Sequence, residues 1–578
     1  MKMKKKLYVC LILAAMALFV ACVGTAEPEQ RIDTSGQWLY VLEDGGATII
    51  GCEVKPEGDL AIPSELDGYA VTGIGRWAFS SNRALIGVTI PASVTDIEEN
   101  PFSSSAIRYI RVASENPVFE SIDGVLFDKE QKRLVSYPHA REGAYAIPEG
   151  TLQIGESAFY RCEGLTSVTI PDSVTRIGSW AFAYCRSLTS VNIPEGVTQI
   201  GDFAFSSCTG LTSMNIPNSV TDIEGNPFAR SKLTRIDVEA NHPVFESVDG
   251  VLFNKQQKML VAYPDAREGT YSIPEGTLII GDSAFTYCVG LTNVTIPDGV
   301  THIGAGAFGG CKGLTSLTIP DSVVQIGYVA FAHSGLTNLI IPDSVTCIGD
   351  STFEGCESLI SVTLSANITR IGDWTFAYCN SLTGVIIPEG VTYIGRLAFY
   401  DCTSLTSITI PASVTSIPSN PFMDCPLTRI DVSAGNPVFE SVRGVLFNTQ
   451  QKALVAYPGA KRGAYTIPKG TLLIGDSAFY GCDRLTSVTI PSTVTHIGDS
   501  AFEGCDRLTR VTIPDSVTQI GNGAFRWCYR LTRVTIPDSV VEIGWNAFER
   551  TGATLRVRQG SFAEQYAKDN EITYAFYR

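Results

Sequence analysis

Histidine and basic side chains are scarce in this 578-residue chain. It contains 5 His, and it has 43 Lys and Arg against 59 Asp and Glu, which gives a formal net charge of −16. Nucleic acid and anionic lipid are both recognised through clusters of positive charge. We therefore expect no nucleic-acid partner. With 44% hydrophobic residues the chain can still bury a core, so disorder is not predicted.

Long apolar runs are also rare. One occurs at 7–21, directly after the basic segment 1–6, and it is too short to span a membrane comfortably. This pattern is typical of a signal peptide, so we expect an exported protein. The letters LFVAC at 18–22 resemble a bacterial lipobox, which favours lipidation at Cys22 as the only membrane contact. Cleavage after Ala26 is the first alternative, and a retained anchor helix is the second.

A 23-residue repeat organises most of the chain. Its consensus is I-G-x-x-A-F-x-x-C-x-x-L-T-S-V-T-I-P-D-S-V-T-x, and its Phe recurs in seventeen copies from Phe79 to Phe548. In L-x-x-V-x-I, alternate side chains of a short strand point inward, and the Pro that follows ends the strand. One such unit has no closed core. The sequence therefore predicts stacked coils that bury Leu, Val, Ile and Phe against their copies.

Three units are longer than the others. Each carries an insertion in which two apolar runs flank a polar turn, which predicts a β-hairpin. The insertions span 124–138, 250–264 and 444–458. Their turns, around Lys129, Lys255 and Thr449, are candidate binding features, because insertions in solenoids often gather on a functional face. The alternative is a structural bulge that block duplication has preserved.

The two ends of the chain depart from the repeat. Alternating patterns at 38–42 and 47–50 predict an N-terminal hairpin, which should cover the exposed edge of the first coil. At the other end, 560–568 predicts a short amphipathic helix and 572–577 a last strand. The predicted organisation is a signal peptide at 1–22, a linker and capping hairpin at 23–69, the solenoid at 70–552 and a C-terminal cap at 553–578.

The consensus resembles the Treponema pallidum-type, or BspA-like, leucine-rich repeat family over about residues 70–552. The resemblance implies a curved, right-handed leucine-rich-repeat solenoid of the α/β class, dominated by β-structure, on the surface of a bacterium or protist. It also implies kinship with adhesins that bind host matrix proteins and other bacteria, although many relatives have no known ligand. The family has no catalytic residue to transfer to this chain.

Most residues that could carry chemistry prove to be repeat columns. Twelve Cys occupy one column that also accepts Asn, Ser and Thr, so we expect small, buried, free thiols rather than disulfides. Residues 304–309 match G-x-G-x-x-G, but these glycines belong to the repeat and no βαβ unit surrounds them. His302 and His496 lie in a variable surface column. We therefore predict no catalytic, cofactor-binding or metal-ligating residue, and no enzyme.

One local departure from the columns is a candidate binding site. Basic residues intrude near the C-terminal coils, close to aromatic ones, and such clusters are common binding hot spots. The candidate ligand-binding residues are Arg484, Arg507, Arg510, Trp527, Arg530 and Arg533. Simple surface drift is the alternative.

These observations favour a non-enzymatic, exported binding protein, anchored on the bacterial surface as an outer-membrane lipoprotein or else secreted. The leading hypothesis is an adhesin for host matrix or neighbouring-cell macromolecules, with an extracellular protein or glycan as its partner. The alternatives are a structural scaffold of the cell envelope and a capture protein for glycans or peptides.

Lipidation at Cys22 can be tested by metabolic labelling with palmitate. We expect the wild-type chain to be labelled and Cys22→Ala to lose the label, because the thiol is the acceptor. Labelling that persists in the variant contradicts the lipoprotein hypothesis and leaves cleavage after Ala26.

Overall fold

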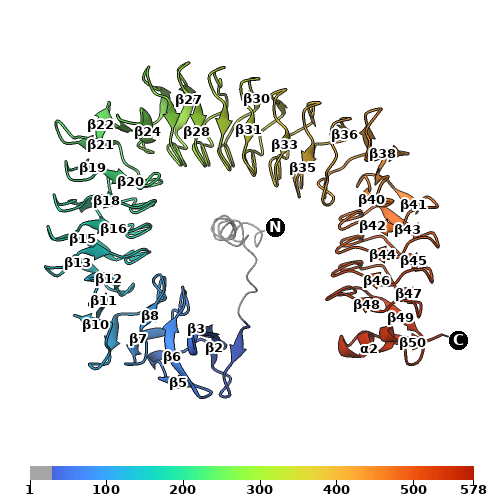
Figure 1. Cartoon of the computed structure of the whole chain (residues 1–578), viewed down its shortest axis with the longest axis horizontal. Helices are drawn as coiled ribbons and strands as arrows, with labels where there is room; N and C mark the ends of the chain where they lie inside the picture. The colour runs from blue at the N-terminus through green and yellow to red at the C-terminus, as the bar shows by residue number, and fades with distance from the viewer. Residues whose placement is uncertain (1–28, 578) are drawn as a thin grey trace. The chain divides into compact units, whose positions relative to one another are not determined.

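The computed structural model describes residues 29–577 (Figure 1). The chain forms two compact units. The first unit extends to Gly143 and includes Gly150–Gly164; the second comprises Ala144–Glu149 and Leu165–Arg578. The predicted signal peptide, with Cys22 and Ala26, lies outside the described residues. None of the helices at 29–577 has the length and apolarity to cross a membrane. The predicted β-dominated solenoid of about 23-residue coils is confirmed.

The first unit is a short stack of coils preceded by a hairpin. Its strands run in chain order as follows: β1 (Arg31–Ile32), β2 (Trp38–Glu43), β3 (Gly46–Cys52), β4 (Gly58–Ala61), β5 (Glu65–Leu66), β6 (Tyr69–Ile74), β7 (Leu85–Ile90), β8 (Asp96–Ile97), β9 (Tyr109–Val112), β10 (Phe119–Ile122), β11 (Val125–Asp128), β12 (Arg133–Ser136) and β14 (Gln153–Ile154). β13 (Gly143–Ala146) begins at the boundary between the units.

In the second unit, the L-x-x-V-x-I segments of successive coils form a ladder of parallel strands. Val511 pairs with Val534, for example, so each side chain lies directly beside its copy in the next coil. The strands are β15 (Leu165–Thr169), β17 (Ser190–Val191), β19 (Ser213–Ile216), β21 (Arg235–Val238), β25 (Gly269–Ser272), β27 (Leu291–Thr295), β30 (Asn338–Ile340), β32 (Ser361–Thr363), β34 (Gly384–Val385), β36 (Ser407–Ile410), β37 (Arg429–Val432), β41 (Gly463–Thr466), β43 (Leu485–Thr489), β45 (Arg510–Thr512), β47 (Arg533–Thr535) and β49 (Thr554–Val557).

A second parallel ladder runs through the two residues that end in the Ile before each Gly. Ile177 pairs with Ile200, and Ile200 with Ile223. The repeat pattern predicts that this Ile points inward, but it does not predict a strand here. The strands are β16 (Arg176–Ile177), β18 (Gln199–Ile200), β20 (Asp222–Ile223), β26 (Ile279–Ile280), β28 (His302–Ile303), β29 (Gln325–Ile326), β31 (Cys347–Ile348), β33 (Arg370–Ile371), β35 (Tyr393–Ile394), β42 (Leu473–Ile474), β44 (His496–Ile497), β46 (Gln519–Ile520) and β48 (Glu542–Ile543).

The Ala-Phe segment makes a third set of bonds between coils. Alternate amides donate to the next coil, such as Phe182 N–H to the carbonyl of Ala204 at 2.7 Å, while the amides between them close tight turns within the coil. This alternation needs a left-handed residue on each side of Ala-Phe. Trp180 and Tyr184 have φ of 58° and 63°. The third ladder was not predicted, because such conformations normally signal Gly.

The Phe column forms the spine of the core. Its rings are fully buried in most coils and lie face to face along the stack, as Phe308 and Phe331 do with centroids 5.6 Å apart and planes at 8°. The Leu, Val and Ile columns are buried around them, and the inward positions predicted from the repeat are confirmed.

Each insertion is a three-stranded antiparallel meander. In the second, β22 (Phe245–Val248) pairs with β23 (Val251–Asn254), which pairs with β24 (Met259–Ala262). The predicted hairpin corresponds to the last two strands, and the first was missed. β24 then pairs in parallel with β26, so the meander joins the second ladder. The third insertion repeats this with β38 (Phe439–Val442), β39 (Val445–Asn448) and β40 (Ala453–Ala456).

A buried Asn accompanies every insertion. The Asn226 side-chain amide donates to the carbonyl of Ser283 at 2.9 Å, across the inserted chain, and its oxygen accepts the Phe228 amide at 3.0 Å. Asn100 and Asn420 make the equivalent bonds. The Asn of Asn-Pro-Phe therefore reconnects the ladder that the insertion interrupts.

Both termini of the solenoid are covered as the patterns predicted. β2 and β3 form the expected hairpin, and β3 pairs with β6 of the first coil. At the other end, α2 (Phe562–Asp569) is capped by Ser561, and Tyr566 packs edge-on against Phe548. β50 (Tyr574–Phe576) then pairs with β49.

Removal of the bridging amide should weaken the coils around an insertion. We expect Asn226→Ala to lower the free energy of unfolding by about 1–3 kcal/mol, because it leaves buried backbone groups without partners. Denaturant unfolding and local hydrogen exchange measure this. Asn215→Ala, at an exposed position of β19, is the matched control. Equal stability of the two variants contradicts the bridging role.

Candidate functional site

The Cys column is buried throughout. All twelve of its members are inaccessible, and most thiols point at the carbonyl of the Phe in the previous coil, as Cys311 does to Phe285 at 2.9 Å. Burial raises the pKa of Cys208 to about 12 and that of Cys356 to about 11. The thiolate, which is the reactive form, is therefore suppressed at neutral pH. The column is part of the core, as predicted.

The His residues include exposed side chains and a buried side chain that hydrogen-bonds to the backbone. His302 and His496 are exposed, in agreement with the variable column. His242 is buried: its Nε2 lies 3.1 Å from the carbonyl of Pro217, and its Nδ1 accepts the amides of Val244 and Phe245. In the other two insertions, Asn116 and Asn436 make the equivalent hydrogen bonds to a Pro carbonyl and from a Phe amide. Within residues 29–577 no group of His, Cys, Asp or Glu could hold a metal ion.

The G-x-G-x-x-G match at 304–309 is part of the ladders. Gly306 donates its amide to Tyr328, and Phe308 donates to Ala330. A phosphate-binding loop needs free amides, whereas these are already bonded to the next coil.

The predicted Arg residues form two adjacent rows. Arg510 and Arg533 begin β45 and β47, and the Val511–Val534 register places them side by side on the exposed face of the ladder. Arg484, Arg507 and Arg530 lie in the turn that precedes each strand, one per coil, and all are exposed. Both rows lie on the same edge of the C-terminal coils.

Trp527 belongs to a different part of the coil. It is a left-handed residue of the third ladder, with φ of 60°, and its amide donates to Glu549. The guanidinium of Arg526 lies 4.3 Å from the centre of its ring and is held by Glu503 at 2.6 Å. Sequence proximity therefore grouped Trp527 with arginines that it is not seen to contact.

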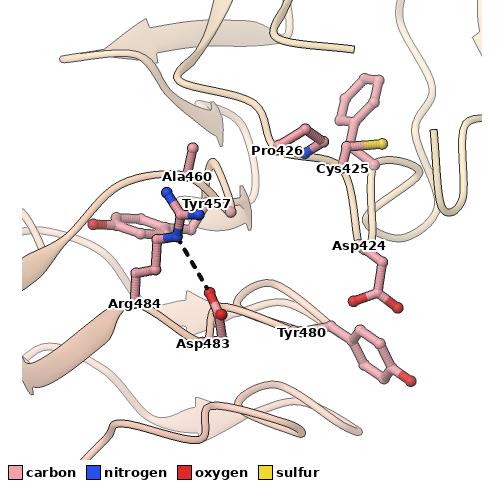
Figure 2. Close-up of a pocket in the computed structure, with 11 residues that line it drawn as sticks. Asp424, Cys425, Pro426, Tyr457, Ala460, Tyr480, Asp483 and Arg484 are labelled. Carbon is pink, nitrogen blue, oxygen red and sulfur yellow. Dashed lines mark ion pairs between the residues drawn. The ribbon is translucent and has the colours of Figure 1, made fainter. Parts of the chain in front are cut away.

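A cavity of about 210 Å³ opens beside Arg484. It lies where the third insertion returns to the coils. Among its lining residues, only Arg484 was predicted as a ligand-binding residue. In Figure 2, Asp424 and Tyr480 lie on one side, while Arg484 reaches Asp483 on the other, with 3.8 Å between Nε and Oδ1. The lining residues are Phe422, Asp424, Cys425, Pro426, Tyr457, Gly459, Ala460, Tyr480, Gly481, Asp483 and Arg484.

A family model for the BspA-type leucine-rich repeat region matches residues 64–133, 144–258, 278–396, 369–448 and 459–562. These segments cover well over half of the chain. The protein belongs to the BspA-type leucine-rich repeat family. None of the curated proteins is significantly similar to this family member.

Several solved structures are similar to this BspA-type protein. The pneumococcal vaccine antigen PcpA is 20% identical, with 71% of this chain and 95% of that chain covered and a TM-score of 0.39. A leucine-rich cell surface protein from Faecalibacterium prausnitzii is 26% identical, with 71% and 96% covered and a TM-score of 0.33. A leucine-rich repeat protein from Bacteroides ovatus is 22% identical, with 96% and 100% covered and a TM-score of 0.25.

Thiol reactivity tests the Cys column. At pH 8 we expect a chromogenic thiol reagent to modify the exposed Cys347 quickly and the twelve column thiols only on unfolding, because the column thiols are buried in the core, where the reagent cannot reach them. Cys347→Ser should remove the fast phase. Denatured protein should give equal thiol counts with and without reductant, and a count that rises with reductant contradicts free thiols.

Proposed function

We propose that this BspA-type protein is a non-enzymatic cell-surface binding protein, an adhesin for host matrix or neighbouring-cell macromolecules. The observation that carries the proposal is the double row of exposed arginines on the C-terminal coils. The chain as a whole is acidic, so a local concentration of cations on one edge is a specific feature of its surface.

The repetitive face supports this proposal because it can make many contacts at once. Along the first ladder, alternate outward positions carry small hydroxyl side chains, such as Ser361 and Thr363 in β32 and Ser407 and Thr409 in β36. Each offers one weak hydrogen bond per coil. A long ligand that lies along the stack engages several coils together, and the effective concentration of the later contacts raises the affinity.

The proposal places the protein outside the cytoplasm. The predicted signal peptide supports export, and lipidation at Cys22 would hold the solenoid at the membrane by its N-terminal end. Cleavage after Ala26 would instead release it. The family resemblance, which implies display on a cell surface, agrees with the anchored form.

Direct binding tests the adhesin function. We expect residues 29–578 to bind immobilised matrix proteins or intact neighbouring bacteria saturably, and we expect Arg510→Ser with Arg533→Ser to weaken the binding at least fivefold. Arg235→Ser is the matched control, because Arg235 begins β21 in the same strand column but is paired with Asp237. Absence of saturable binding to either surface contradicts the proposal.

A further inference from the structure

Four successive arginines break one column of the repeat. The residue before the Leu column is Gly or Ser in most coils of the second unit. Examples are Ser187, Gly210, Gly290, Gly313, Gly335, Ser358, Ser381 and Ser404; Lys232, Pro426 and, in the second insertion, Glu268 are exceptions. In the C-terminal coils the corresponding residues are Arg462, Arg484, Arg507 and Arg530, and Gly552 ends the run. A column of small turn residues has thus become a column of cations.

Three equivalent residues form what we call the corner of each insertion. Their net charge is negative in the first and second insertions and positive in the third. In the second insertion, Asp249 pairs with Arg267 at 2.7 Å, and Glu268 follows. In the first, Asp123 pairs with Arg141 at 3.3 Å, and Glu142 follows.

The third insertion holds only basic residues at the equivalent positions: Arg443, Lys461 and Arg462. Lys461 donates to the carbonyl of Arg443 at 2.8 Å, so the corner keeps its shape while the carboxylates are gone.

The basic residues of this corner and of the Arg column form one continuous strip, which comprises Arg443, Lys461, Arg462, Arg484, Arg507 and Arg530. The amide of Gly463, next to Arg462, donates to the carbonyl of Arg484 at 3.1 Å, so the insertion corner and the Arg column are direct neighbours. Successive members of the column are about 4.8 Å apart, the spacing of a ladder. Arg462, Arg507 and Arg530 are exposed, and no carboxylate in the described residues lies within ion-pair distance of them.

The cavity beside Arg484 also arises from differences between copies. At the second insertion the equivalent space holds Asp265, where burial raises the pKa to about 6, and Tyr287, whose ring lies 3.7 Å from the Arg230 guanidinium carbon. At the third, Gly459 and Gly481 replace these two side chains. The backbone is held alike, since Ala460 donates to Leu427 as Ala266 does to Leu233. The absence of these two side chains therefore leaves the space of the pocket at the end of the strip.

We propose, resting on the binding function above, that this strip and pocket bind a linear acidic polysaccharide that runs along the stack of coils. Carboxylate or sulfate groups repeated along the chain would pair with the Arg column, because guanidinium groups match both in a bidentate geometry. One sugar ring would enter the pocket, where Tyr457 offers an aromatic wall and Asp424 and Asp483 accept hydroxyl hydrogen bonds. Carboxylates at these positions disfavour a polyphosphate, which has no hydroxyl groups to donate.

Titration calorimetry of residues 29–578 with heparin fragments and with polygalacturonate tests the proposal, and the two probes separate sulfate from carboxylate recognition. We expect saturable binding of at least one, weakening as salt rises. The variant Arg462→Ser, Arg484→Ser, Arg507→Ser and Arg530→Ser should bind at least tenfold more weakly, with a smaller salt dependence. A control with Lys258→Ser, Lys312→Ser, Arg370→Ser and Arg396→Ser removes four charges from other coils and should bind within twofold of wild type.

The pocket is tested separately by Gly481→Tyr, which restores the side chain that Tyr287 supplies at the equivalent position of the second insertion. We expect at least threefold weaker binding with an unchanged salt dependence. Wild-type affinity in the four-Ser variant, or equally tight binding of polyphosphate that the same variants weaken, overturns the proposal. If matrix or cells bind but neither polysaccharide does, this inference fails and the adhesin function stands; if nothing binds, both fail.

Discussion

The whole structure depends on hydrogen bonds between equivalent residues of successive coils. Each coil must present amides and carbonyls at three places so that the next coil can pair with it in register. Once this register is set, every side chain lies beside its own copy, which explains why Phe rings stack on Phe and thiols on thiols. Burial of the columns then follows, because one coil supplies the apolar surface that its neighbour needs.

The pattern of apolar residues was enough to predict the coils, the inward columns, the insertions and both caps. Two of the three ladders escaped prediction for physical reasons. Strands of two residues, such as β16 and β18, are too short to show a period. The ladder at Ala-Phe uses left-handed residues as bulky as Trp180 and Tyr184, and nothing in their local sequence indicates a left-handed conformation. Only stacking against the neighbouring coils makes it favourable.

The candidate site was predicted in part for a related reason. Arg484, Arg507 and Arg530 stand out because they occupy a repeat column that usually holds small residues. Arg443, Lys461 and Arg462 were missed, because the insertion shifts them out of the simple period and their meaning appears only when the three insertions are compared. The pocket was missed because it results from side chains that are absent at Gly459 and Gly481. Trp527 shows the opposite error, where closeness in sequence suggested a contact that the coil geometry does not make.

The left-handed residues on either side of Ala-Phe have a consequence for how such a protein can evolve. A left-handed conformation costs a non-glycine residue about 1–2 kcal/mol, and here the ladder enforces it in both columns whatever the side chain, except at Asn100, Asn226 and Asn420 of the Asn-Pro-Phe coils. The two columns accordingly hold residues as different as Trp374, Leu397, His333 and Arg550. Since the ladder fixes the backbone conformation, substitutions at these positions can change the side chains of one coil without changing the fold. Each coil can therefore acquire its own surface chemistry during evolution.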